Sequence, residues 1–213
     1  MPCVTILRKK DYILATIEYP SQLTNGQSRA SILALLQNRL SPERYQHCLR
    51  VEQTARELAE RFGEDVDRAG LAGLLHDYAK EISKTDYIDV IKRNGFDLDL
   101  LHYNRGIWHG IVGTWFIKQE VGVTDHLVIQ AIEHHTTGDP NMSTLDQIIF
   151  VADFIEPERK LEAEVKARAA AKTNMREATL IELENTLSYL ISNRQIVYPK
   201  TLLTYNAFIQ PKE

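Results

Sequence analysis

Residues 72–80 read Ala-Gly-Leu-Leu-His-Asp-Tyr-Ala-Lys, and this stretch places a histidine beside an aspartate within an otherwise apolar, helix-like run. A carboxylate in such surroundings costs free energy unless a partner compensates its charge. A divalent metal ion is the usual compensator, because a neutral imidazole and a carboxylate are both good ligands for it. The pair His76-Asp77 therefore predicts part of a metal site, provided that the rest of the chain supplies further ligands.

The chain on both sides of this stretch has the apolar spacing of amphipathic helices. Ser41-Pro42, Ser83 and Ser143 are predicted helix starts, because serine caps a helix and proline is favoured at its first position. The predicted helices cover about residues 28–40, 42–63, 65 through the His-Asp pair, 83–95, 107–122, 124–138, 143–157 and 174–193. The fold class is therefore all-α, a single helical bundle over residues 27–208.

Residues 1–26 differ from the bundle, because β-branched and aromatic residues there are followed by Pro20, Asn25 and Gly26. We expect a short N-terminal extension, either a hairpin or a poorly ordered arm, and we assign it no role.

Composition limits the classes of function. The 213 residues are enough for one domain, and 44% hydrophobic and 25% charged residues are typical of a soluble globular protein. A net charge of −4 gives no basic surface for nucleic acid. No apolar run is long enough for a membrane span, and no signal peptide is recognisable, so we expect a cytoplasmic protein. Cys3 and Cys48 form neither a disulfide framework nor a zinc motif.

Further candidate ligands lie on the predicted inward faces of separate helices. They are His47, His109, His135 and Asp153. Taken singly, an inward histidine is more often a hydrogen-bonded core residue than a ligand. Together with His76-Asp77, however, these groups favour a metal site, because a buried carboxylate has few other compensators. His135 is expected to point inward, whereas His134 is expected to lie behind the ligands or to face solvent. His102 and His126 are expected at the surface.

Five segments carry a resemblance to a known family. They are Arg44-Tyr45-Gln46-His47, Leu75-His76-Asp77-Tyr78-Ala79-Lys80, Trp108-His109-Gly110, His135-Thr136-Thr137-Gly138 and the run 151–159, Val-Ala-Asp-Phe-Ile-Glu-Pro-Glu-Arg. With them the chain resembles the HD superfamily of metal-dependent phosphohydrolases, and more closely its YqeK family of symmetrical dinucleoside tetraphosphate hydrolases. The resemblance covers about residues 28–208 and implies an HD-domain bundle that cleaves diadenosine tetraphosphate into two ADP.

The resemblance also implies roles for individual residues. The metal ligands would be His47, His76, Asp77 and Asp153, with Asp77 bridging if a second ion is present. Asp77, His109 and His135 would be catalytic, the two histidines either completing a second metal site or contacting phosphate. The implied metal is iron, one or two ions per site, although manganese, cobalt and nickel suit the same ligands. Substrate contacts are expected from Arg44, Asp77, Tyr78, Ala79, Lys80, His109, His135, Arg159, Ile196, Val197, Tyr198, Pro199, Lys200 and Thr201.

Two other functions compete with this one. An HD phosphohydrolase acting on a mononucleotide or cyclic nucleotide would use the same ligands, and a non-catalytic metal- or nucleotide-binding regulator could retain them. The expected partner is a small nucleotide, with no nucleic acid and no membrane, and a homodimer is left open.

Overall fold

The computed structural model describes residues 17–210, and this part of the chain is helical with no β-strand, as the sequence predicts. The 3₁₀ element η1 covers Leu98–His102 and the π-helical turn η2 covers Ile117–Val121. The α-helices are α2 (Ser21–Thr24), α3 (Arg29–Arg39), α4 (Pro42–Phe62), α5 (Val66–Leu75), α6 (Lys84–Arg93), α7 (Arg105–Ile111), α8 (Gly113–Phe116), α9 (His126–His134), α10 (Thr144–Ile155), α11 (Glu162–Ala170), α12 (Met175–Ser192) and α13 (Pro199–Ile209).

Short polar residues start the helices where the sequence predicts. The Ser41 hydroxyl accepts a hydrogen bond from the Arg44 backbone N–H at the start of α4, which has Pro42 at its first position. Ser143 and Asp146 form a reciprocal capping box on α10. The helix predicted from residue 124 begins two residues later, because the Asp125 carboxylate accepts the backbone N–H groups at the start of α9.

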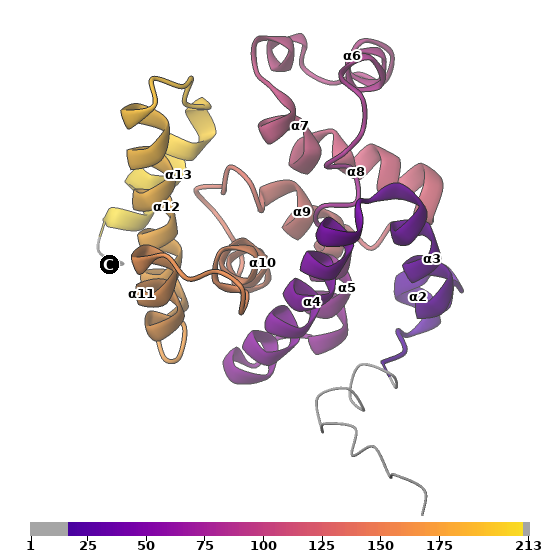
Figure 1. The fold of residues 1–213 in the computed structure, drawn as a ribbon, viewed down its shortest axis with the longest axis horizontal. Helices are drawn as coiled ribbons and strands as arrows, with labels where there is room; N and C mark the ends of the chain where they lie inside the picture. Colours follow the sequence, from indigo (N-terminus) through magenta and orange to yellow (C-terminus); the bar gives the residue numbers. More distant parts are fainter. Residues whose placement is uncertain (1–16, 211–213) are drawn as a thin grey trace, which may run out of the picture.

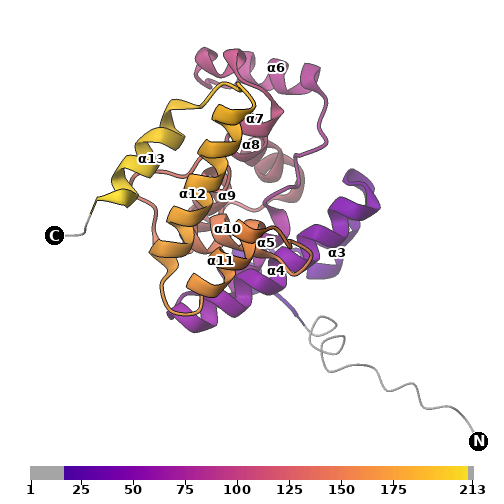
Figure 2. The ribbon, with the colours of Figure 1, turned by 60° about the vertical axis from the view of Figure 1, so that its left-hand side comes forward.

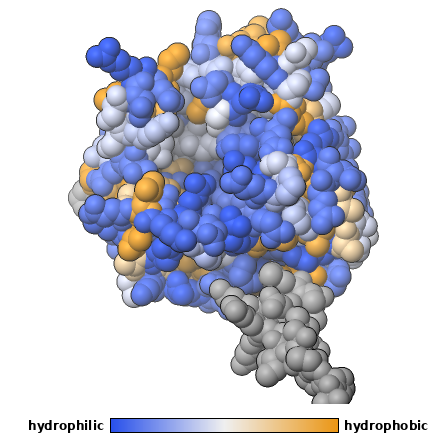
Figure 3. Space-filling model, in the orientation of Figure 1, coloured by the Kyte–Doolittle hydropathy of each residue, from blue (hydrophilic) through white to orange (hydrophobic). Residues whose placement is uncertain are grey.

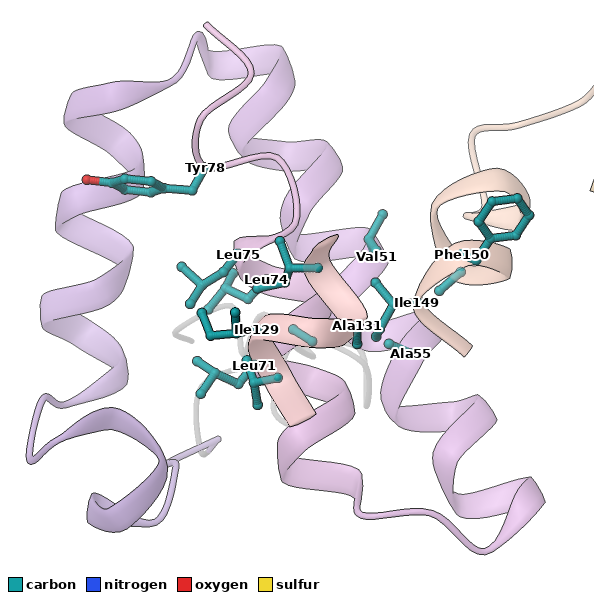
Figure 4. Packing of buried hydrophobic residues seen from close by; sticks show 14 of the residues in the cluster. Val51, Ala55, Leu71, Leu74, Leu75, Tyr78, Ile129, Ala131, Ile149 and Phe150 are labelled. Carbon is teal, nitrogen blue, oxygen red and sulfur yellow. The ribbon is translucent and has the colours of Figure 1, made fainter. Parts of the chain in front are cut away.

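The elements are arranged around a central group formed by α4, α5, α9 and α10. Helix α4 packs along α5 and also contacts α10, and α9 contacts both α5 and α10. Helices α11, α12 and α13 lie on one side of this group, and α6, α7 and α8 lie on another (Figures 1 and 2). Figure 4 shows the apolar side chains that fill the centre, among them Val51, Leu74, Ala131 and Ile149. The site residues are thus carried by helices whose relative positions depend on one shared core.

Close packing of α4 on α5 depends on a small residue. A Cβ atom at Gly73 would lie 3.0 Å from the Val51 carbonyl oxygen and 3.1 Å from the Ala55 Cβ. The absence of a side chain there lets the two backbones approach, which brings the end of α5 beside His47 on α4.

Other parts of the fold also differ from the sequence prediction. Helix α5 ends at Leu75, so the His76-Asp77 pair lies at its C-terminal end and in the turns that follow. Helices α11 and α13 were not predicted. Residues 17–26 form neither a hairpin nor an arm, because Ile17, Tyr19 and Leu23 are buried against the bundle. Residues 1–16 lie outside the described residues.

Two surface properties bear on function. None of the helices between residues 17 and 210 has the length and apolarity needed to cross a membrane. The face in Figure 3 is mostly hydrophilic, with scattered hydrophobic side chains.

Candidate metal centre

Six side chains from five parts of the bundle converge on one buried centre. His47 comes from α4, His109 from α7 and Asp153 from α10, while His76 and Asp77 follow α5 and His135 follows α9. The four histidines and Asp77 are at most 5% exposed, and the Asp153 side chain is 24% exposed. All the ligands expected from the sequence are therefore brought together.

One group of atoms gathers around His47 and His76. The His47 Nε2 lies 3.0 Å from Asp153 Oδ1 and 3.3 Å from the His76 Nε2. Asp77 Oδ2 lies 3.4 Å from the His76 Nε2 and 3.8 Å from the His47 Nε2. Two imidazoles and two carboxylates at these separations can share one divalent cation.

A second group gathers at the other oxygen of Asp77. Asp77 Oδ1 lies 3.2 Å from the His109 Nε2 and 3.9 Å from the His135 Nε2, and these two nitrogens are 3.0 Å apart. The two carboxylate oxygens of Asp77 thus face different histidines, so Asp77 would contribute to both sets if the centre held two ions.

In each histidine ring the outer nitrogen, Nδ1, faces away from the centre, and its partner shows which ring atom can bind a cation. The Nδ1 atoms of His76, His109 and His135 lie 2.8, 3.0 and 2.5 Å from the carbonyl oxygens of Gly73, Arg105 and Ile132, respectively. A carbonyl oxygen can only accept, so each neutral ring carries its proton on Nδ1. Its Nε2 lone pair then points into the centre, as in a metal-ligating histidine held by an outer acceptor.

Without a cation these contacts conflict with one another. Nε2 lone pairs would face each other and the carboxylates, and the buried oxygens Asp77 Oδ1 and Asp153 Oδ1 have no hydrogen-bond donor. A positive ion relieves both problems, so the donor set fits a divalent metal.

For most of these groups the pKa shifts favour the protonation state that binds a metal, which is a neutral imidazole or an ionised carboxylate. Burial, followed by the Lys80 charge, lowers the pKa of His109, and burial together with the neighbouring rings of His109 and His76 holds the pKa of His135 well below its ordinary value. Burial alone would raise the pKa of Asp77, but His76 and Lys80 outweigh it and lower that pKa. His76 differs, because Asp77 raises its pKa against the effect of burial. A proton and a cation therefore compete for His76.

Three cationic side chains border the centre, as expected. Arg44 Nη1 lies 2.8 Å from Asp77 Oδ2, and Arg159 Nη2 lies 3.6 Å from Asp153 Oδ1. Lys80 Nζ lies 2.9 Å from the His109 Nε2 and 3.4 Å from Asp77 Oδ1. All three are partly exposed, so they can meet a ligand that approaches from solvent.

Tyr78 and Ala79, both expected to contact substrate, lie away from the centre. The Tyr78 side chain points toward α3 (Figure 4), where Arg39 stacks on its ring, and its hydroxyl donates to Glu120 of η2 at 2.7 Å. Ala79 is fully buried, and its carbonyl oxygen accepts a hydrogen bond from the Tyr87 hydroxyl. Their side chains serve packing in this structure, because residues in the turns after α5 point in different directions.

The segment 196–201 lies beside a cavity of about 740 Å³ between α7 and the α12–α13 pair. Ile196 and Thr201 line it, as do Ile107 and Thr136, which are close in sequence to His109 and His135. The Tyr198 ring packs edge-to-face on Tyr103. Val197 and Pro199 complete the turn into α13, and Lys200 Nζ lies 3.1 Å from Asp139.

The remaining histidines are placed as expected. His102 and His126 are exposed, and His134 contacts Asp139 and Asp146 outside the centre.

Two side chains that sequence reasoning missed extend the site. Glu156 is 2% exposed and contacts His47, and Arg50 holds Glu156 with two hydrogen bonds. Burial alone would raise the pKa of Glu156, but Arg50 outweighs it and lowers that pKa. Helical spacing in the sequence could have indicated both residues. Arg50 is three residues after His47 and Glu156 is three after Asp153, one helical turn in each case.

Comparison with known proteins agrees with this geometry. A model of the HD domain matches residues 44–158. The chain is 41% identical to a symmetrical bis(5'-nucleosyl)-tetraphosphatase from Halalkalibacterium halodurans, over 85% of this chain and 97% of the relative. It is 39% identical to the protein of the same name from Bacillus subtilis, over 84% of this chain and 96% of that one.

A solved structure agrees as well. The crystal structure of a protein from Clostridium acetobutylicum, described as a predicted HD superfamily hydrolase involved in NAD metabolism, has a TM-score of 0.82 and 36% identity, covering 86% of this chain and 97% of that one. From its sequence and its fold together, the chain belongs to the HD domain family and, within it, to the symmetrical bis(5'-nucleosyl)-tetraphosphatases.

Proposed function

We propose that this protein is a metal-dependent hydrolase that cleaves diadenosine tetraphosphate symmetrically into two ADP. The observation that carries the proposal is the convergence of four Nε2 atoms and two carboxylates on one buried centre, with the Nδ1 atoms of three rings held by carbonyl oxygens. The relatives named for this activity match nearly the whole described domain.

The residues divide into two ligand sets. His47, His76, Asp77 and Asp153 would hold one divalent ion, and Asp77 with His109 and His135 would hold a second. We propose iron, and manganese, cobalt or nickel would suit the same imidazole and carboxylate ligands. The chemistry that such an ion supplies is the activation of water and the polarisation of a phosphoryl oxygen.

The neighbouring cations act on the substrate. Arg44, Lys80 and Arg159 border the centre, so they can bind the phosphate chain and offset the negative charge that grows on its oxygens during cleavage. Lys80 contacts both ligand types, because its ammonium group lies near His109 Nε2 and Asp77 Oδ1.

His109 and His135 have two alternative roles, as ligands or as a proton source for the leaving ADP. We favour the ligand role, because their lowered pKa values keep both rings neutral near neutral pH. A neutral ring with its proton on Nδ1 offers a lone pair, and no proton, to the centre.

The cavity beside segment 196–201 suits the nucleoside. Its lining combines aliphatic and tyrosine side chains with threonine hydroxyls, as small-molecule sites commonly do. Tyr198 and Tyr103 together offer an aromatic surface against which a base can pack. We further propose that the protein acts in the cytoplasm on this small nucleotide and has no nucleic-acid partner; a homodimer would be compatible with this function.

The test combines product analysis with metal analysis. The protein loaded with Fe²⁺ or Mn²⁺ should convert diadenosine tetraphosphate to ADP alone. ATP plus AMP as products would contradict symmetrical cleavage, and faster turnover of a mononucleotide or cyclic nucleotide would favour another HD phosphohydrolase activity. Metal uptake without turnover of any nucleotide would favour a regulator.

Asp77→Ala should abolish both metal uptake and turnover, because the two carboxylate oxygens of Asp77 contact both ligand sets. The matched control is Asp89→Ala, which removes the same charge from an exposed position on α6. Full activity in Asp77→Ala would overturn the assignment.

A further inference from the structure

His47 differs from the other three histidines in how its outer nitrogen is held. The Nδ1 atoms of His76, His109 and His135 face backbone carbonyl oxygens, whereas the His47 Nδ1 faces the Glu156 carboxylate, with Oε1 at 3.4 Å. A carbonyl is neutral and fixed by the backbone, but a carboxylate is charged and depends on its own partners for its orientation. His47 is therefore the ring in this centre whose orientation depends on another side chain.

Glu156 is held firmly by its own surroundings. Arg50 donates from Nε to Oε2 at 2.7 Å and from Nη2 to Oε1 at 3.3 Å, a two-point contact that fixes the plane of the carboxylate. The Glu158 backbone N–H donates to Oε2 at 2.8 Å. Arg159 contributes less, because its Nε is 3.9 Å from Oε1.

The three residues connect two helices at the centre. Arg50 lies one turn after His47 on α4, and Glu156 is the residue directly after α10, one turn beyond Asp153. The chain Arg50–Glu156–His47 therefore joins the two helices that supply His47 and Asp153, whose Nε2 and Oδ1 atoms are 3.0 Å apart.

We propose that Glu156, held in place by Arg50, is a positioning residue that keeps His47 protonated on Nδ1 with its Nε2 directed into the metal centre. The inference rests on the proposed function in so far as that centre binds a divalent metal. A carboxylate behind a ligating imidazole fixes its tautomer and raises its basicity, and loss of such a partner typically weakens metal binding by about 10–100-fold. An Arg50–Glu156 pair that only linked α4 to α10 would affect stability without changing the tautomer of His47.

The experiment uses variants of the full chain and two readouts other than activity. Glu156→Ala removes the acceptor, Glu156→Gln keeps an acceptor oxygen without the charge, and Arg50→Gln removes the two-point contact. The matched control is Glu158→Gln, which removes the same charge two residues further along the chain. The Glu158 side chain is 62% exposed. The readouts are the tautomer of His47, from long-range ¹H–¹⁵N NMR of the metal-free protein, and the Kd for Mn²⁺, from competition with a chelator.

We expect the unmodified protein to have His47 protonated on Nδ1. Glu156→Ala should shift this ring toward the Nε2 tautomer and weaken Mn²⁺ binding by about 10–100-fold. Glu156→Gln and Arg50→Gln should show smaller losses, and Glu158→Gln none. Adding Arg50→Gln to Glu156→Ala should cause little further loss, because both changes act through the same carboxylate.

An unchanged tautomer together with unchanged Mn²⁺ affinity in Glu156→Ala would overturn the positioning role. If Glu156→Ala does not fold, the same two readouts are taken on Glu156→Gln and Arg50→Gln, and no change in either readout would overturn the positioning role. If the unmodified protein takes up no Mn²⁺, the proposed function is what fails, and the tautomer of His47 by itself then supports or overturns the role of Glu156.

Discussion

At the scale of single residues, Lys80 is the clearest test of how the centre handles phosphate. Its ammonium group lies within 3.4 Å of both Asp77 and His109 yet remains partly exposed. Lys80→Met should lower kcat/KM for diadenosine tetraphosphate by about 10–100-fold, the equivalent of losing one or two charge-assisted hydrogen bonds. Steady-state kinetics measures this, while metal content should stay close to that of the unmodified protein.

The control for Lys80 is Lys84→Met, which removes the same charge at the exposed start of α6. Equal activity of the two variants would mean that Lys80 balances the charge of Asp77 and does not contact substrate.

At the scale of elements, the docking of α13 depends on one glycine. Gly138 has φ 65°, and a Cβ atom there would lie 2.6 Å from Thr204 Cγ2 on α13. Gly138→Ala should therefore displace α13 and with it segment 196–201, raising KM for the dinucleotide while Mn²⁺ binding persists. The strained backbone should also cost about 1–3 kcal/mol of stability.

Gly63→Ala is the matched control for that variant. Gly63 has φ 73°, but a Cβ atom added at this position would have no neighbouring atom within 4 Å, so the substitution reproduces the backbone strain without the clash. If both variants raise KM equally, the displacement of α13 is not the cause.

The contact between α9 and α10 makes stability depend on pH. Burial alone would raise the pKa of Asp146, but the nearby His134 ring and hydrogen bonds from Gln130 and the Ser143 backbone outweigh it and lower that pKa below its ordinary value of 3.8. Because the folded pKa is lowered, this carboxylate stabilises the fold fully above pH 3.8 and loses its contribution as the pH falls through the folded value.

Asp146→Asn should accordingly cost about 1–3 kcal/mol near neutral pH, and the difference from the unmodified protein should shrink in acid. Urea unfolding at a series of pH values measures the difference. Asp86→Asn, at the equivalent but exposed position of the α6 cap, should show a smaller effect. A difference that does not change with pH would exclude this role for Asp146.

At the scale of the whole molecule, the centre joins helices from all parts of the central group. Its candidate ligands come from α4, α7 and α10 and from the turns after α5 and α9, so a bound ion would stabilise the folded state by mass action. An ion at 100 times its Kd adds about 2.7 kcal/mol, which should raise the thermal midpoint by roughly 5–10 °C.

Thermal unfolding in Mn²⁺ and in chelator measures this shift. The shift should vanish in Asp77→Ala and persist in Asp89→Ala. A midpoint that does not respond to Mn²⁺ would contradict a metal centre formed by these helices.

The sequence by itself determined the features that depend on local chemistry. Helical period and serine caps located most helices, since a cap and a 3.6-residue repeat act within a few residues. The same logic located the six candidate ligands, because residues three or four apart share a face and buried carboxylates need compensation. Prediction from the sequence failed for residues 17–26 and for α13, where burial against the bundle outweighs a weak local preference for one secondary structure.

Only the tertiary structure decided how the ligands are grouped. The two Asp77 oxygens face different sets of histidines, and Glu156 contacts a histidine 109 residues away. Both contacts depend on how α4, α5 and α10 cross. It also turned Tyr78 toward α3, although Tyr78 adjoins Asp77 in the chain. The physical reason is that these distances follow from close packing of side chains across the core, which no local repeat in the sequence encodes.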